Sequence, residues 1–222
     1  GQGSQSLGML SDLRSNFSLV NEIFQEASDA VNLDLWKIIN EDPELLSLSE
    51  NTQPIMLAAG YATYKVLASE ISLSPISIAG HSLGEYTALV AAESLSFFEA
   101  VKLVKKRAEL MQDAIPRGSG SMAAILGLDD VIVIEICIKA SDEGVVEAVN
   151  FNSPGQVVIA GEKHAVSHAC ELMKVAGAKR ALVLPVSVPS HCSLMKDVAT
   201  DFKHSVDNIN FQMGNEKVLH NV

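Results

Sequence analysis

Positive charge is scarce in this chain, which has 16 Lys and Arg residues against 27 Asp and Glu residues. The formal net charge of −11 argues against general nucleic-acid binding, because that activity needs a basic footprint. An acidic protein partner stays open, since a local basic patch can steer association against the overall sign. The candidate basic groups are Lys102, Lys105 and Lys106, then Lys179 and Arg180, and finally Lys196. They either form such a patch or are ordinary solvated side chains.

Long apolar runs and paired cysteines are also missing. No run approaches the roughly 20 apolar residues that a membrane-spanning helix needs. The three cysteines, Cys137, Cys170 and Cys192, are odd in number and form no CxxC pair, so neither a disulfide framework nor a zinc site is predicted. The opening GQGSQSLGML has neither the basic flank nor the continuous apolar stretch of a secretory signal. We therefore expect a cytoplasmic protein that binds no metal and enters no membrane.

A serine nucleophile is predicted by the stretch GHSLGE at 80–85. It fits the G-x-S-x-G pattern of a nucleophile elbow, in which the serine is exposed on a tight turn between a strand and a helix. The apolar run at 74–80 begins near a proline and ends in glycine, which favours a buried strand, and 83–92 contains good helix formers. Ser82 is therefore the candidate nucleophile.

The next helix carries a charge on its apolar side. Ser96 and Glu99 match a capping box. Apolar residues follow at steps of three and four before Pro116 and Gly118, at Phe97, Val101, Val104, Ala108, Met111 and Ile115. Arg107 lies inside this apolar arc. Its guanidinium needs a partner, which is an internal carboxylate, water reached by snorkelling, or the carboxylate of a substrate.

Residues 118–187 form a separate small unit by pattern. Strands are expected at 121–128, 145–152, 156–161 and 181–187, with a turn at 152–155 and a helix at 162–180 that Gly177 closes. The segment 129–144 alternates like a strand but has the length of a helix, and we assign a helix. The resulting βαββαβ order is typical of a ferredoxin-like unit. The expected fold is therefore α/β, with an α/β-hydrolase-like core of parallel sheet at 1–117 and 188–222 and an inserted ferredoxin-like subdomain at 118–187.

A serine needs a base, and six histidines are available. His191 follows the apolar strand at 181–187 closely, in the region where active-site loops of α/β folds gather, so it is the favoured base. His81 adjoins Ser82 and is expected to point elsewhere. Cys192 beside His191 suggests a cysteine–histidine pair, which is disfavoured because adjacent side chains rarely face each other. His164 and His168 are spaced as one face of a helix, and we interpret them as a solvated face rather than a metal site. His204 and His220 have no partner motif.

Six stretches, in the same order, resemble the bacterial malonyl-CoA:acyl carrier protein transacylases. They are GQGSQ at 1–5, TQP at 52–54, GHSLGEYTALVAA at 80–92, R-x-x-x-M-Q at 107–112, FNSPGQVVIAG at 151–161 and GAKRALVLPVSVPSHCSLM at 177–195. Together they extend over nearly the whole chain. Such a set is far more specific than G-x-S-x-G alone.

The resemblance implies a role for each matching residue. Ser82 would carry a malonyl ester and His191 would be its base and acid. The backbone N–H groups of Gln2 and Leu83 would form the oxyanion hole. Arg107 would bind the free carboxylate of the malonyl group. The remaining expected substrate contacts are Asn152, Ser190 and His81.

The resemblance also implies partners. Malonyl-CoA would donate the acyl group to Ser82, and the phosphopantetheine thiol of acyl carrier protein would accept it in a ping-pong reaction without a bound cofactor. Because such carriers are acidic, Lys179, Arg180 and Lys105 become docking candidates. We expect a monomer. Compared with the family, the chain lacks the first strand and the last quarter, so both ends of the core are expected to be truncated.

Two alternatives remain from the sequence. A serine hydrolase or thioesterase of the α/β-hydrolase type would need an acid between serine and histidine, for which Asp129 or Asp142 could nominally serve. The inserted subdomain, the GQGSQ start and the position of Arg107 argue against it. An acyltransferase with another acyl specificity shares the same motifs, and a docking module without catalysis is opposed by Ser82, His191 and Arg107.

Overall fold

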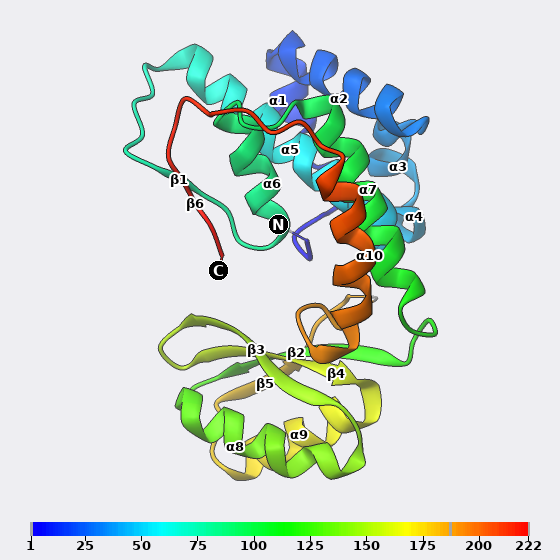
Figure 1. Cartoon of the computed structure of the whole chain (residues 1–222), viewed down its shortest axis with the longest axis vertical. Helices are drawn as coiled ribbons and strands as arrows, with labels where there is room; N and C mark the ends of the chain where they lie inside the picture. Colours follow the sequence, from blue (N-terminus) through cyan, green and yellow to red (C-terminus); the bar gives the residue numbers. More distant parts are fainter. Residues whose placement is uncertain (1, 187, 222) are drawn as a thin grey trace. The chain divides into compact units, whose positions relative to one another are not determined.

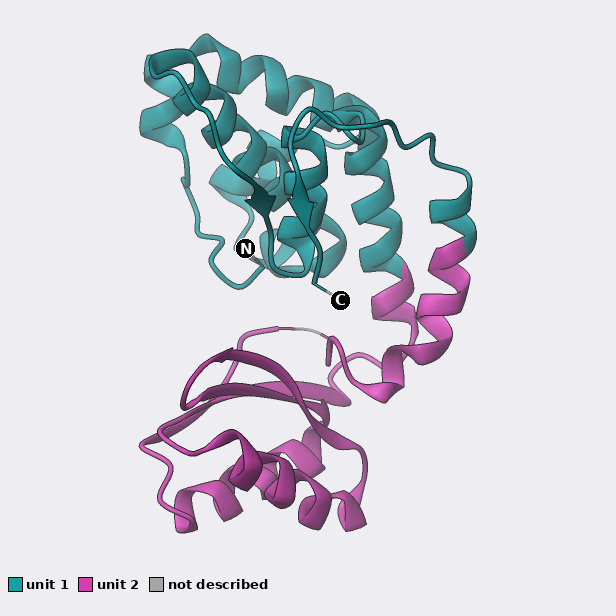
Figure 2. Cartoon of the chain, turned by 60° about the vertical axis from the view of Figure 1, so that its left-hand side comes forward, with its two compact units in different colours: residues 1–109, 204–222 teal, residues 110–203 magenta. Residues whose placement is uncertain are grey.

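The computed structural model describes residues 2–186 and 188–221. Gly1, Ser187 and Val222, which lie at the ends of predicted segments, are outside the described residues. The chain divides into two compact units, one made of residues 1–109 with 204–222 and one of residues 110–203 (Figure 2). The second unit is wider than the subdomain predicted at 118–187, because a small core of Met111, Val188, Met195 and Val198 joins its flanking segments.

The first unit begins with helices, which are α1 (Ser11–Asn16), α2 (Ser18–Val31), α3 (Leu35–Glu41), α4 (Pro43–Ser47) and α5 (Ser49–Glu70). Strand β1 (Ile78–Ala79) and helices α6 (Leu83–Ala91) and α7 (Phe97–Asp113) follow, and β6 (Val218–Leu219) comes last. Helix α5 packs against α2 and α6 (Figure 1). Apolar side chains that are fully buried form the core, among them Phe24, Leu35, Ile39, Ile55 and Leu57. The helix predicted at 83–92 is confirmed.

The strand before Ser82 is shorter than predicted. It covers Ile78–Ala79 rather than 74–80, and it pairs in parallel with β6 through Ile78↔Val218 and Ala79↔Leu219. Ile76 is 97% exposed, so the expected burial of this run is wrong for the part of the chain described here. Pro75 has no N–H to donate to a sheet, which limits pairing at the start of the run.

The second unit is a four-stranded antiparallel sheet with the order β3-β4-β2-β5. Along the chain it runs through β2 (Gly120–Leu126), α8 (Asp130–Ala140), the 3-10 helix η1 (Ser141–Glu143), β3 (Val146–Ser153), β4 (Gln156–Glu162), α9 (Lys163–Val175) and β5 (Arg180–Val183). A second 3-10 helix, η2 (Ser193–Met195), leads into α10 (Lys196–Asp207), whose last residues belong to the first unit. The helix predicted for the ambiguous segment 129–144 is confirmed by α8.

Alternation along the strands divides this unit into two layers of packing. On one face, Ala123, Ile125, Val157 and Ile159 pack against α8 and α9, which lie side by side (Figure 1). On the other face, Met122, Val158 and Ala160 pack with Cys192 and with side chains of the segment after β5. Successive side chains of a strand point to opposite faces, so both layers follow from the sequence of the strands.

Two predicted boundaries in this unit are corrected. Strand β5 ends at Val183 rather than at 187, because Pro185 has no N–H to donate to a ladder. The turn expected at 152–155 is confined to Pro154 and Gly155, since β3 extends to Ser153. The register between β3 and β4 shifts between Phe151 and Ser153, which makes Asn152 the extra residue of a bulge.

No helix in the described part of the chain is long and apolar enough to cross a bilayer.

The two valines of α8 test its helical structure. Residues two apart share a face in a strand but lie on nearly opposite sides of a helix. Val133 is fully buried and Val131 is 64% exposed. We expect Val133→Ala to lower the free energy of unfolding by about 1–3 kcal/mol. Val131→Ala should change it by less than about 0.5 kcal/mol. Denaturant titration measures both, and equal losses would mean that the two side chains share one environment.

Candidate active site

Ser82 occupies the turn between β1 and α6 in an unusual backbone conformation. Its φ of 52° and ψ of −111° lie in a region that residues with a side chain rarely adopt. This is the strained geometry that a nucleophile elbow requires. Gly80 allows the turn, because a Cβ there would lie 2.0 Å from the carbonyl of Gly84. Gly84, by contrast, has nothing within 4 Å of the corresponding position apart from its chain neighbours and the backbone of its own helix.

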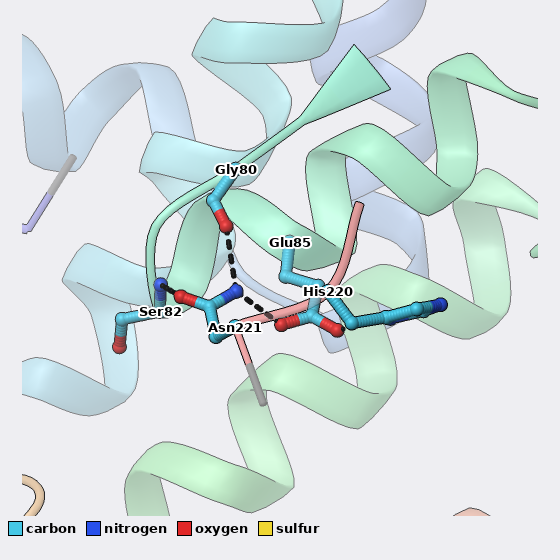
Figure 3. Close-up of polar contacts among 5 residues, drawn as sticks. All are labelled: Gly80, Ser82, Glu85, His220 and Asn221. Atoms are coloured by element: carbon cyan, nitrogen blue, oxygen red, sulfur yellow. Dashed lines mark hydrogen bonds and ion pairs between the residues drawn. The ribbon is translucent and has the colours of Figure 1, made fainter. Parts of the chain in front are cut away.

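The polar groups of this turn are held by Asn221, which follows β6. Its Oδ1 accepts a hydrogen bond from the backbone N–H of Ser82 at 3.0 Å, and its Nδ2 donates to the carbonyl of Gly80 at 2.8 Å. The same Nδ2 donates to the carboxylate of Glu85 on α6, whose other oxygen pairs with His220 (Figure 3). Neither Asn221 nor Glu85 was identified from the sequence. GHSLGE includes Glu85, but the motif alone does not say what its carboxylate contacts.

Arg107 reaches Ser82 from α7. Its Nη2 donates to Ser82 Oγ at 3.2 Å and its Nη1 donates to Gln53 Oε1 at 2.8 Å. The guanidinium carbon lies 5.8 Å from the ring centroid of Tyr86. Burial lowers the pKa of Arg107, and the nearby Tyr86 partly opposes that shift, but a guanidinium stays protonated. The prediction that Arg107 lies on the apolar side of its helix is confirmed by buried Val104 and Ala108 around it.

An internal carboxylate partner for Arg107, one of the alternatives left open by the sequence, is absent. Within residues 2–186 and 188–221 no Asp or Glu oxygen lies within 4.0 Å of the guanidinium. Its partners are neutral oxygens, the amide of Gln53 and the hydroxyl of Ser82. A positive charge that is half-buried and bonded only to neutral groups can still bind an anion.

Gln53 extends the polar contacts from Arg107 to the start of the chain. It is fully buried, and its Nε2 donates to Gln2 Oε1 at 3.3 Å. Gln2 Nε2 in turn donates to Ser49 Oγ at 2.8 Å. A continuous set of hydrogen bonds therefore links Ser49, Gln2, Gln53, Arg107 and Ser82. The motif TQP at 52–54 contains Gln53 but does not by itself assign it a role; the signal in the sequence is a run of polar residues at the start of a helix.

Leu83 and His81 flank Ser82. Leu83 is the first residue of α6, where backbone N–H groups have no acceptor inside the helix. Such a group is suited to an oxyanion. His81 is exposed, and its carbonyl accepts the N–H of Gly84 at 2.9 Å, which closes the turn.

The other predicted site residues belong to the second unit. His191 is exposed and has a positive φ of 69°, in a turn just before η2. The sequence predicted that His191 closely follows the end of a strand. This is wrong, because β5 already ends at Val183. Ser190 is half-buried, with its N–H bonded to the carbonyl of Val188 at 3.1 Å. Asn152 is exposed on the bulge of β3.

Cysteine chemistry is disfavoured here. Cys192 is buried, and its thiol donates to the carbonyl of Pro189 at 3.1 Å. Burial raises the pKa of Cys192 and of Cys170, and it raises the pKa of Cys137 to about 12. Thiols of this kind are protonated at neutral pH and are poor nucleophiles. The cysteine–histidine alternative therefore finds no support.

The basic candidates are partly neutralised. Lys105 pairs with Glu109 at 3.3 Å and Lys102 with Glu99 at 3.8 Å. Arg180 is the first residue of β5. His164 and His168 both contact Glu143, and across the described ranges no cluster of three or more His, Cys, Asp or Glu side chains could hold a metal ion.

Comparisons with known proteins agree on one family. The family described as "Acyl transferase domain" matches residues 1–217. A malonyl CoA-acyl carrier protein transacylase of Haemophilus influenzae is 52% identical, over 100% of this chain and 72% of its own length. The protein of that name from Escherichia coli K12 is 49% identical with the same coverage. A solved complex, described as a type II PKS acyl-carrier protein with its malonyl-transacylase, has a TM-score of 0.96 at 48% identity, covering 100% of this chain and 72% of that one.

The two glycines of the elbow give a matched pair of substitutions. Gly80→Ala forces a Cβ against the backbone of Gly84, so we expect it to lower the free energy of unfolding by about 1–3 kcal/mol or more. Gly84→Ala meets no neighbouring atom and lies in the first turn of a helix, where alanine is favoured over glycine, so stability should be kept. Thermal unfolding of both variants measures this, and an equal loss would contradict the close approach at Gly80.

Proposed function

We propose that this chain, which belongs to the acyl transferase domain family, is a malonyl-CoA:acyl carrier protein transacylase. It transfers the malonyl group from malonyl-CoA to the phosphopantetheine thiol of acyl carrier protein through an ester on Ser82. The observation that carries this proposal is the contact between Arg107 and Ser82 Oγ, made by a guanidinium without a carboxylate partner in the described chain. A malonyl ester on that oxygen brings a free carboxylate to the guanidinium.

The first half of the reaction acylates Ser82. His191 takes the proton from Ser82 Oγ, and Oγ forms a bond to the thioester carbonyl carbon. The carbonyl oxygen becomes an oxyanion, which the N–H groups of Leu83 and Gln2 stabilise; one such donor is worth a factor of about 10² to 10³ in rate. The carbon–sulfur bond then breaks, and CoA leaves as a thiol with the proton held by His191. Support for the donors comes from Leu83 at the start of α6 and from the bonded side chain of Gln2.

The second half returns Ser82 to its free form. The thiol of the carrier gives its proton to His191 and attacks the ester carbonyl, and Ser82 leaves with that proton. Arg107 holds the malonyl carboxylate through both halves, because its planar fork matches a carboxylate with two parallel hydrogen bonds. The remaining substrate contacts proposed are His81, Asn152 and Ser190. Malonyl-CoA is a substrate, and no cofactor is required by this chemistry.

The finer description of the fold supports the same function. We infer that the first unit is an α/β-hydrolase-like core, since its nucleophile lies on a turn between a parallel strand and a helix. We infer that the second unit is ferredoxin-like, since its elements follow the order βαββαβ in an antiparallel sheet. Acyl carrier protein is the proposed partner, with Lys179, Arg180 and Lys105 as docking candidates. The cytoplasmic location and the monomeric state stay predictions.

Loss of the nucleophile tests the covalent intermediate. Ser82→Ala should abolish the malonyl adduct that intact-mass spectrometry detects after mixing with malonyl-CoA. Ser96→Ala is the matched control, because Ser96 only caps α7 through the N–H of Glu99, and its loss costs about 1 kcal/mol of stability. An adduct that persists in Ser82→Ala would place the ester on another residue.

Removal of the guanidinium tests the malonyl preference. Arg107→Ala should slow malonyl transfer to the carrier by about 10²-fold, while transfer from acetyl-CoA is kept or increased, because acetyl has no carboxylate. Arg107→Lys keeps the charge but loses the planar fork, so its rate of malonyl transfer should lie between those of the wild type and Arg107→Ala. Transfer assays with both donors decide the matter: equal losses for malonyl and acetyl would rule out a carboxylate clamp.

A further inference from the structure

We propose that Asn221 is a positioning residue for Ser82, whose side-chain amide holds the elbow in its strained, reactive conformation. The inference rests on the proposed function in one respect, that Ser82 is the nucleophile. It adds a residue 139 positions away in the sequence whose contact is with the backbone of the nucleophile rather than with substrate.

The amide of Asn221 matches two backbone polar groups of the elbow that lie outside its strand and its helix. Strand β1 ends at Ala79 and α6 starts at Leu83, so the carbonyl of Gly80 and the N–H of Ser82 belong to neither ladder. Asn221 accepts from that N–H at 3.0 Å and donates to that carbonyl at 2.8 Å (Figure 3). A carboxamide offers the same acceptor and donor as a backbone peptide group.

Asn221 therefore continues the sheet around a corner. The parallel pairing of β1 with β6 ends at Ala79↔Leu219. Two residues later, the side chain of Asn221 supplies the next pair of hydrogen bonds, at the point where the backbone of β1 has already turned toward α6. One side chain thus binds the backbone on either side of His81, directly before the residue that carries φ 52°.

Glu85 fixes the orientation of the amide. Its Oε2 accepts from Asn221 Nδ2, so that nitrogen has two acceptors and the oxygen is directed to the N–H of Ser82. The amide could not be flipped without placing its oxygen against the carboxylate and the Gly80 carbonyl. The other carboxylate oxygen of Glu85 pairs with His220 Nδ1 at 2.6 Å. Glu85 also lies in the first turn of α6, where the helix dipole favours an acidic side chain.

Loss of this amide releases the elbow. A serine with positive φ relaxes unless its surroundings hold it. Its Oγ then moves relative to the base and the oxyanion donors, and a displacement of about 1 Å can cost about 10²-fold in rate. Substrate binding through Arg107 does not depend on the backbone of Ser82, so positioning predicts a loss of rate at nearly constant affinity.

The experiment compares Asn221→Ala and Asn221→Asp with the matched control Asn215→Ala in the full protein chain. Asn215 lies in the same unit, and its Nδ2 likewise donates to a glutamate, Glu93, away from the elbow. Two single-turnover rates are measured by intact mass, malonylation by malonyl-CoA and labelling of Ser82 by a fluorophosphonate. Both rates should fall about 10- to 100-fold in the Asn221 variants. The concentration of malonyl-CoA that gives half of the maximal rate should change less than about threefold. Asn215→Ala should stay within about twofold of wild type.

The pH dependence of Asn221→Asp separates positioning from loss of fold. This substitution keeps the shape and the acceptor but replaces the donor by a carboxylate oxygen, which faces Glu85, its partner His220 and the carbonyl of Gly80. Protonation of the introduced carboxyl restores one donor. The labelling rate of Asn221→Asp relative to wild type should therefore rise as the pH falls from about 8 to 5, because effects on the rest of the site cancel in the ratio.

The outcomes are distinct. Unchanged rates in both Asn221 variants, equal losses in Asn215→Ala, or a ratio that stays flat with pH would each overturn the role of Asn221. If wild type forms no malonyl adduct but Ser82 is labelled by the fluorophosphonate, the proposed substrate is wrong and the labelling rates still decide the role of Asn221. Thermal unfolding of every variant accompanies the rates, so that a loss of fold is recognised by a matching loss of melting temperature.

Discussion

The tight turn at Ser82 is the constraint on which the rest of the first unit depends. A serine with a positive φ is unfavourable by itself, on the order of 1–3 kcal/mol, and must be held by what surrounds it. Gly80 allows the close approach of the backbone, Asn221 satisfies the polar groups of the turn, and α6 begins directly after it. The short pairing of β1 with β6 has its meaning here, because it brings Asn221 beside residues that precede it by most of the chain.

A second organising interaction is the charge on the apolar side of α7. Arg107 is held in place by neutral oxygens, so its orientation is set while its charge stays available to an anion. The buried amide of Gln53 links it to Gln2 at the start of the chain. In the proposed reaction the residue that recognises the carboxylate and the residue that supplies an oxyanion donor are therefore neighbours in one hydrogen-bonded network. Such networks favour a single arrangement when every member is satisfied.

Local signals made much of this predictable. Ser82 follows from G-x-S-x-G between an apolar run and a helix, and Arg107 follows from its place in a helical arc that Ser96 and Glu99 open. The lengths of the strands could not be predicted from apolar content alone, because Pro75 and Pro185 limit the pairing of β1 and β5. Asn152 was expected in a turn, and only the register of β3 reveals the bulge. The contacts of Asn221 and Gln53 were not predicted, because their partners are remote in sequence. The pairing of His191 with Ser82 stays a prediction.

The hydrogen bond between Ser82 and Asn221 also has a consequence for the order of folding. Its partners are separated by 139 residues, and contacts of such separation form slowly because a long loop must close first. The backbone hydrogen bonds of helices α5, α6 and α7 join residues four apart, so these bonds form sooner. During synthesis, moreover, Asn221 leaves the ribosome long after the serine. The turn with positive φ at Ser82 is therefore supported by Asn221 only after β1 has paired with β6, and a molecule that has not yet formed this pairing lacks that support.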